Sequence, residues 1–187
     1  MPDLLVNIAP GHEHGLLLRN PVIISCGTFG QDGYGSQMPS GVDFQRLGAV
    51  VAKTTTIQPR MGNPTPRIAH ARSWTINSIG LQNPGIEVVL REQAPRWANW
   101  QVPVILSIAG ERVDEYRDLA AAIEGTPGIA AIEINVSCPN VEGGLDFGQS
   151  SDFTGEVVSA VVRSTQLPVI TKLSPNVTDI VAIANAA

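Results

Sequence analysis

Residues Asn135 to Asn140 bring two amides, a hydroxyl and a thiol together within one short segment. They follow an apolar run, 129–134, that predicts a buried strand, and Pro139 marks a turn. α/β folds carry their chemistry in turns at the carboxyl ends of such strands. The thiol of Cys138 could act as a base or nucleophile, and the amides could bind a planar, hydrogen-bonding ligand. A proline turn with a half-buried structural cysteine explains the segment equally well.

Composition limits the classes of protein to consider. The 187 residues are 43% hydrophobic and 16% charged, which predicts one globular domain, 1–187. A net charge of −5 without a basic stripe disfavours nucleic-acid binding. There is no apolar run of roughly 18 residues and no basic, apolar leader, so we expect no membrane span and no signal peptide. The two cysteines lie far apart in sequence, which favours free thiols and a cytoplasmic location.

Continuous apolar runs, rather than alternating ones, predict strands that are buried on both faces, as in parallel sheets. Apolar residues at helical spacing fall between several of these runs, at 113–123, 151–163 and 180–187. The pattern from 102 to 187 therefore predicts alternating strands and helices. The five predicted strands are 21–25, 48–53, 102–107, 129–134 and 167–172.

Two segments depart from this alternation. Residues 5–18 predict a small hairpin before the first strand. Residues 54–85 form a long polar segment rich in Pro and Gly, and such loops in compact domains are usually functional. The sequence stops inside a helical pattern after five strands. It therefore describes either an open five-stranded sheet or the N-terminal part of an eight-stranded barrel.

Six motifs, taken in chain order, resemble those of the dihydroorotate dehydrogenase family. Any one of them alone would be weak, whereas six in the right order are specific. The resemblance runs from about residue 4 to the last residue and is greatest to class 1, the NAD-linked type. The motifs are NPVIISCGTFG (20–30), LGAVVAKTTT (47–56), GNPTPR (62–67), NSIGLQNPG (77–85), INVSCPNV (134–141) and VITKLSPNVTD (169–179).

This resemblance implies a (β/α)8 TIM barrel with FMN at the carboxyl ends of its strands, here as about the first five βα units behind an N-terminal β-hairpin. The implied reaction is the oxidation of dihydroorotate to orotate in de novo pyrimidine biosynthesis. A cysteine base, matched by Cys138, takes the C5 proton while hydride passes from C6 to flavin N5. The implied assembly is a homodimer with an iron–sulfur FAD electron-transfer subunit, and NAD is the final acceptor.

The resemblance also implies a set of binding residues, because orotate is a flat anion that needs amide partners and a cation. A lysine near the flavin pyrimidine edge would stabilise the anionic reduced flavin. Without the resemblance, each Asn is better explained as a turn residue that bonds its own backbone. The implied substrate-binding residues are Lys53, Asn77, Ile79, Gly80, Leu81, Asn135 and Asn140. The implied cofactor-binding residues are Cys26, Gly27, Lys53, Thr54, Ser107, Asn135 and Lys172.

Two positions depart from the family pattern. Cys26 stands where the family usually has a flavin-contacting Ser, and Ser107 stands where many relatives have Asn. A disulfide between Cys26 and Cys138 is not expected, since it would block the base. The pair His12 and His14 around Glu13 is better explained as a solvated loop than as a metal site, so no metal is expected.

Two other functions remain open at this stage. One is a related flavin barrel that reduces uracil or thymine, like the reductase domain of dihydropyrimidine dehydrogenase. The other is a truncated chain without catalysis. The family holds the FMN phosphate in glycine-rich loops after strands seven and eight, and the 187 residues contain no counterpart. The chain by itself is therefore expected to be inactive.

Overall fold

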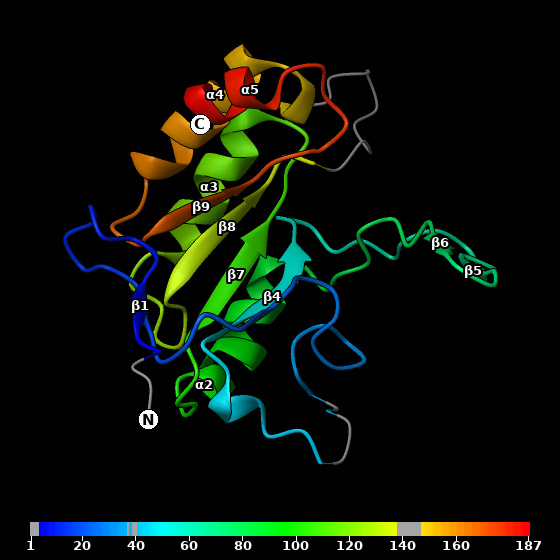
Figure 1. The fold of residues 1–187 in the computed structure, drawn as a ribbon, viewed down its shortest axis with the longest axis horizontal. Helices are drawn as coiled ribbons and strands as arrows, with labels where there is room; N and C mark the ends of the chain where they lie inside the picture. Colours follow the sequence, from blue (N-terminus) through cyan, green and yellow to red (C-terminus); the bar gives the residue numbers. More distant parts are fainter. Residues whose placement is uncertain (1–3, 37, 39–40, 138–146) are drawn as a thin grey trace.

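The computed structural model describes residues 4–36, 38, 41–137 and 147–187. Its main sheet is parallel, with five strands in the order in which they occur in the chain (Figure 1). Doubly wound sheets reverse their strand order part-way, whereas a barrel adds each new strand on the same side. The order is therefore that of successive strands in a (β/α)8 barrel, as predicted. The strands are β3 (Ile23–Ile24), β4 (Ala49–Thr55), β7 (Val104–Ile108), β8 (Ala131–Asn135) and β9 (Val169–Lys172).

The three predicted helices are confirmed as α3 (Val113–Ile123), α4 (Ser151–Val162) and α5 (Ile180–Ala186). The hydroxyl of Ser150 accepts a hydrogen bond from the Phe153 amide at the start of α4, 3.4 Å away. The carboxylate of Asp179 accepts the amides of the first turn of α5. Both contacts satisfy amides that have no partner within the helix. No helix in the ranges that the structure covers is both long and apolar enough to cross a membrane.

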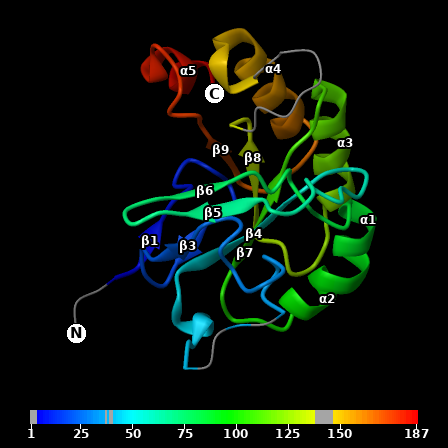
Figure 2. The same cartoon turned by 90° about the vertical axis from the view of Figure 1, so that its right-hand side faces the viewer.

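Both faces of the sheet are covered over its lower part, which explains why the strands begin with apolar residues, whereas polar residues stand at or near their carboxyl ends. The outer face packs against helices α1 to α4, as Figure 2 shows for α1, α2 and α3. The inner face is covered at its lower end by the predicted N-terminal hairpin, β1 (Val6–Asn7) and β2 (Leu17–Leu18). The inner cluster consists of Leu16, Leu18, Ala49, Val51, Ile105 and Ala131.

The connection from β3 to β4 contains a 3-10 turn at Phe44–Arg46 in place of an α-helix. Five glycines between residues 27 and 41 make a regular helix costly. Aromatic packing holds this connection instead: Tyr34 stacks on Trp97 with ring centroids 6.2 Å apart, and the Trp97 indole donates to the Tyr34 carbonyl. The connection is thereby fixed against the base of the sheet.

A helical segment at 86–97 is one that the sequence analysis did not predict. It consists of α1 (Ile86–Val88), a π-helical turn (Val89–Gln93) and α2 (Ala94–Trp97). Pro95 has no amide hydrogen and its ring crowds the preceding turn, which accounts for the widened turn before it. Its buried side chains recur at helical spacing, and this spacing in the sequence would have predicted the helix. They are Ile86, Val89, Ala94 and Trp97.

The long polar segment 54–85 carries an antiparallel hairpin, β5 (Ile68–His70) and β6 (Thr75–Asn77). Figure 1 shows this hairpin extending away from the body of the molecule. A single antiparallel bridge between Arg60 and Asn83 closes its root. We call residues 60–83 the arm.

Candidate active site at the strand mouth

A connected row of polar side chains crosses the carboxyl ends of the parallel strands, at the end of the sheet that we call the mouth. Thr54, at the end of β4, lies at its centre. The Thr54 hydroxyl oxygen lies 3.0 Å from the sulfur of Cys26, which follows β3, and 3.0 Å from the hydroxyl of Ser107 on β7. The amide of Asn135 at the end of β8 donates to the same oxygen at 3.2 Å. The structure therefore brings four predicted cofactor-binding residues together.

Hydrogen-bond capacity fixes much of this arrangement. A hydroxyl has one hydrogen to donate and two lone pairs. Because Asn135 must donate to Thr54, the Thr54 hydroxyl donates to either Ser107 or Cys26 and accepts from the other. The Thr54 backbone amide also donates to the Cys26 sulfur, at 3.2 Å. Three of these side chains, those of Thr54, Ser107 and Asn135, are almost completely buried. A satisfied, buried network of this kind is rigid.

The row continues to the fifth strand through Ser137, which the predicted set does not include. The Ser137 hydroxyl donates to the side-chain oxygen of Asn135 at 2.8 Å and accepts from the ammonium of Lys172. The phenol of Tyr116 on α3 donates to the Asn135 carbonyl at 3.0 Å, which fixes the end of β8 from the outer layer. The position of Ser137, two residues after the Asn that ends the strand, could have indicated that it lies at the mouth. In the structure its hydroxyl bonds the Asn135 side chain.

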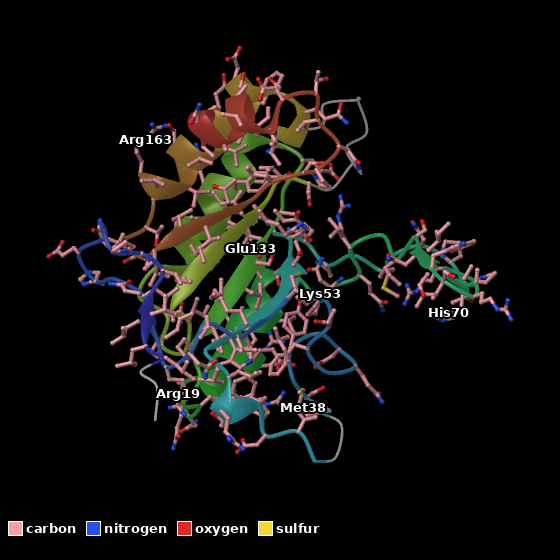
Figure 3. All side chains as sticks on the ribbon, viewed as in Figure 1. Arg19, Met38, Lys53, His70, Glu133 and Arg163 are labelled. Atoms are coloured by element: carbon pink, nitrogen blue, oxygen red, sulfur yellow. The ribbon has the colours of Figure 1, made fainter. Side chains whose placement is uncertain are left out.

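Lys53 lies beside this row, where the arm leaves the body (Figure 3). Its backbone amide donates to the carbonyl of Gly33 at 2.9 Å. A β-carbon at Gly33 would come within 2.8 Å of the Lys53 side chain, and its φ of +79° also favours glycine. A β-carbon on Gly27 would lie 3.7 Å from the Lys53 ammonium. Both glycines therefore leave room around the lysine.

The ammonium groups of Lys53 and Lys172 form no ion pair with a carboxylate in the described ranges. Lys53 and Gly27 line a cleft of about 720 Å³, together with Ile79 and Asn83 from the returning strand of the arm. The lining of this cleft carries the cations of Lys53, Arg60 and Arg67 against the carboxylates of Asp32 and Glu92, so its net charge is positive. Such a site suits an anionic or electron-rich ligand.

The predicted substrate segment is divided by the structure. Ile79 lines the cleft beside Lys53. Gly80 has a φ of +74° and packs against Asn63 within the arm, whereas Leu81 lines a different pocket. Asn77 lies exposed on β6, and no hydrogen bond joins its side chain to the row. Cys138 and Asn140 lie outside the described residues, and Ser137 is the last described residue before them.

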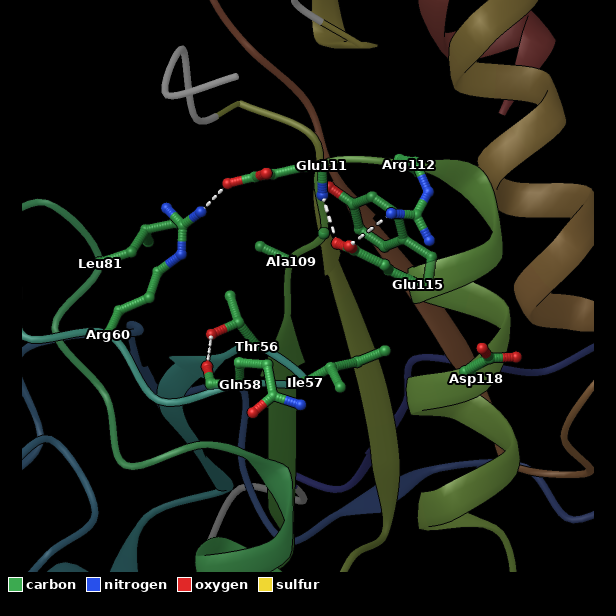
Figure 4. Close-up of a pocket in the computed structure, with 12 residues that line it drawn as sticks. Thr56, Ile57, Gln58, Arg60, Leu81, Ala109, Glu111, Arg112, Glu115 and Asp118 are labelled. Carbon is green, nitrogen blue, oxygen red and sulfur yellow. Dashed lines mark hydrogen bonds and ion pairs between the residues drawn. The ribbon is translucent and has the colours of Figure 1, made fainter. Parts of the chain in front are cut away.

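A second pocket, of about 340 Å³, lies between the end of β4 and the start of α3 (Figure 4). Its charged groups neutralise one another: Arg60 pairs with Glu111, and Arg112 pairs with Glu115 at 3.4 Å. The Glu111 amide donates to the Glu115 carboxylate at 2.7 Å. Because these charges are already paired, we consider the cleft beside Lys53 the better candidate site.

Two further side chains near the sheet were not singled out from the sequence. Glu133 on β8 is 8% exposed, and one of its carboxylate oxygens has no hydrogen-bond partner in the described residues. An acidic residue within the apolar run 129–134 was the feature of the sequence that could have identified Glu133 as a buried carboxylate. Burial raises the pKa of the Tyr34 phenol, whose oxygen lies 3.1 Å from the Thr55 hydroxyl beneath the mouth. Tyr34 therefore stays a neutral, structural group.

Metal ligands do not gather in the part of the chain that the structure describes, where no group of three or more His, Cys, Asp or Glu could hold an ion. His12 and His14 lie in the turn of the N-terminal hairpin with ring centroids 5.8 Å apart. The row of hydroxyl, amide, thiol and ammonium groups is thus the chemical feature to compare with known proteins.

The family model for dihydroorotate dehydrogenase matches residues 12–187. The NAD-linked dihydroorotate dehydrogenase B catalytic subunit of Desulforudis audaxviator is 53% identical over 92% of this chain, and that of Pelobacter propionicus is 45% identical over 99%. The chain spans 56% and 59% of the length of these two relatives. A solved structure, ligand-free DHODH from Eimeria tenella, has a TM-score of 0.75 at 22% sequence identity. The alignment covers the whole of this chain and 59% of the length of that structure. The barrel fold is thereby confirmed, and the chain belongs to the dihydroorotate dehydrogenase family.

Proposed function

We propose that this chain is part of an FMN-dependent enzyme that oxidises dihydroorotate to orotate, with NAD as the final acceptor. The observation that carries the proposal is the polar row across five successive strand ends, beside the cation of Lys53. The chain's membership of the dihydroorotate dehydrogenase family gives this row its chemical assignment.

The mouth residues fit the ring system of a flavin. Its pyrimidine edge carries carbonyl oxygens and an imide, which need donors and a cation rather than carboxylates. The row supplies hydroxyl and amide groups, and the ammonium groups of Lys53 and Lys172 are free of acidic partners in the described ranges. Gly27 offers a side-chain-free surface next to Lys53. When bound, FMN would supply the acceptor for the hydride of the reaction, and with it for both electrons.

We assign the chain's own residues three tasks. Lys53 binds the anionic substrate, and the amides of Asn77, Asn135 and Asn140 orient its planar ring. The buried contacts of Thr54 hold the mouth rigid, which keeps reacting groups in position. The thiolate of Cys138 takes the C5 proton of the substrate onto its sulfur.

The partners of the enzyme follow from the same assignment. The two relatives are each named as a catalytic subunit, which implies a separate electron-transfer subunit in their enzymes. We propose the same for this protein, with iron–sulfur and FAD centres in the second subunit. We also propose that the catalytic subunit forms a homodimer, that its residues 1–187 fold within a single domain, and that the enzyme works in the cytoplasm.

The test uses the whole protein, purified with its flavin. We expect flavin absorbance, and dihydroorotate-dependent reduction of a small dye acceptor that greatly exceeds any reaction with dihydrouracil. Lys53→Met should raise KM for dihydroorotate and weaken orotate binding. Arg163 is an exposed cation on the outer layer, and Arg163→Met should change neither KM nor orotate binding. Protein without flavin, or faster turnover of dihydrouracil, would overturn the assignment.

A further inference from the structure

The arm carries the side chains of a binding surface rather than those of an ordinary loop. Several of its large apolar side chains are exposed: Met61 by 85%, Trp74 by 55% and Ile76 by 61%. A two-stranded hairpin alone is marginally stable in water, and clustered exposed apolar groups mark interaction sites. Trp, Met and Arg are also the residue types enriched at protein interfaces.

The root of the arm is held firmly, so the arm has a defined direction. Backbone hydrogen bonds of 2.8 and 3.0 Å join Arg60 to Asn83. The Asn83 side chain is 5% exposed, accepts from the amides of Thr56 and Gly85, and donates to the Thr56 hydroxyl. The ion pair of Arg60 with Glu111 ties the root to the start of α3. These contacts fix the root of the arm to the body.

Charge separates the arm from the rest of the chain. The arm contains Arg60, Arg67 and Arg72 and no Asp or Glu, so its net charge is +3, whereas the rest of the chain carries −8. Arg60 at the root pairs with Glu111, so Arg67 and Arg72 carry the positive charge that the arm offers to a partner. A cationic surface with exposed apolar groups complements a partner whose docking face is acidic around an apolar recess. Two arms would repel each other, which disfavours pairing of arm with arm.

The position of the arm indicates what such a partner does. Arg67 and Ile68 of the arm line the cleft that also contains Lys53. A partner that covers the arm along its length, from the outer hairpin to Arg67 and Ile68, therefore reaches the rim of the proposed cofactor site. A partner that only dimerises has no need of this position, whereas a partner that collects electrons does.

We propose that the arm is the docking surface for an acidic electron-transfer subunit, with Trp74 and Ile76 as its apolar anchors and Arg72 as a charged contact. This inference rests on the proposed function. Dihydroorotate loses two electrons and two protons to become orotate. The subunit takes both electrons and passes them to NAD+, which takes up one proton to form NADH while the other is released.

The experiment uses the whole catalytic protein and its electron-transfer subunit. It measures the Kd between them, and dihydroorotate-dependent reduction of NAD+ and of a small dye. The double variant Trp74→Ala with Ile76→Ser should raise Kd about 30-fold or more, because buried aromatic anchors dominate interfaces. It should lower NAD+ reduction at limiting subunit and leave dye reduction unchanged. Arg72→Glu should raise Kd and reduce its dependence on salt.

Matched controls are Val181→Ala and Arg163→Glu, which change exposed side chains on α5 and just beyond α4. Neither should alter Kd. An unchanged Kd in both arm variants would overturn the proposal, as would light scattering that shows the arm variants losing a homodimer while keeping the subunit. Failure of the wild-type protein to reduce the dye with dihydroorotate would instead overturn the proposed function, since Kd is measured without turnover.

Discussion

The strand mouth and the arm both consist of polar, Thr- and Asn-rich sequence, but they use these residues in opposite ways. At the mouth, Thr54 and Asn135 are buried and satisfy each other's hydrogen bonds. On the arm, the Thr75 hydroxyl bonds its cross-strand neighbour His70 and remains exposed. The mouth is thus built to hold reacting groups still, and the arm to offer a surface to another molecule. The same substitution should have different consequences in the two regions.

The largest expected effect concerns the chemistry at the mouth. Cys138→Ser in the whole enzyme should lower kcat for dihydroorotate about 100-fold or more, because a serine hydroxyl is far less ionised than a thiol near neutral pH. Flavin content and orotate binding should be largely retained. Rate measurements from pH 6 to 10, a range of about two units around an ordinary thiol pKa, should show the base ionisation shifted in the variant.

Cys26→Ser is the matched control for this prediction. Cys26 accepts from the Thr54 amide, and serine can replace that contact. We expect little change in turnover. If the two cysteine variants were equally impaired, Cys138 would have no special role as the base.

The second prediction compares one substitution in the two regions. Thr54→Val removes a hydroxyl that contacts Cys26, Ser107 and Asn135, and leaves buried polar groups without a partner. The free energy of unfolding should fall by about 1–3 kcal/mol. Thr75→Val on the arm should change it by less than about 0.5 kcal/mol, since that site is exposed. Urea denaturation of the two variants measures both values, and equal losses would contradict the contrast between the regions.

A third prediction concerns the root, where the arm meets the mouth. Asn83→Ala removes three contacts to Thr56 and one to the Gly85 amide, and should cost about 1–2 kcal/mol of stability. It should also increase hydrogen exchange across the arm. Asn63→Ala, which removes exposed contacts to Ser78, is the control and should affect only its own turn. Unchanged exchange in the Asn83 variant would show that the root does not hold the arm.

The sequence allowed more of the mouth than of the arm to be predicted. Apolar runs ending in Lys53, Asn135 and Lys172 could be placed on strands of one parallel sheet, because strand periodicity and family motifs act along the chain. The contact of Ser137 with Lys172 and the burial of Glu133 depend on how neighbouring strands align, and a local sequence pattern does not predict that alignment. The π-helical turn before Pro95 was missed because proline signals a break, although the apolar spacing continued through it.

The arm was predicted only as a long functional loop. Its hairpin is short and exposed on both faces. It therefore has no alternating pattern of apolar and polar residues from which its strands could be predicted. Asn77 was assigned to the substrate by motif, while in the structure it lies on this exposed hairpin. Motifs identify which residues matter, whereas their exposure depends on contacts that are distant in sequence.

The smallest expected effect is the change in the free energy of unfolding when one exposed contact outside both regions is removed. The Glu124 carboxylate accepts hydrogen bonds from the Thr165 hydroxyl and the Gln166 amide, and these bonds hold its pKa below the usual 4.5. A lowered folded-state pKa stabilises the protein above pH 4.5, and this contribution is lost as pH falls through the folded-state pKa. Glu124→Gln should therefore cost at most about 0.5 kcal/mol near pH 7, because solvent screens the site, and less at pH 3. Unfolding at the two pH values measures this difference; a loss as large as that of Thr54→Val would mean that burial is not what distinguishes the mouth from the rest of the surface.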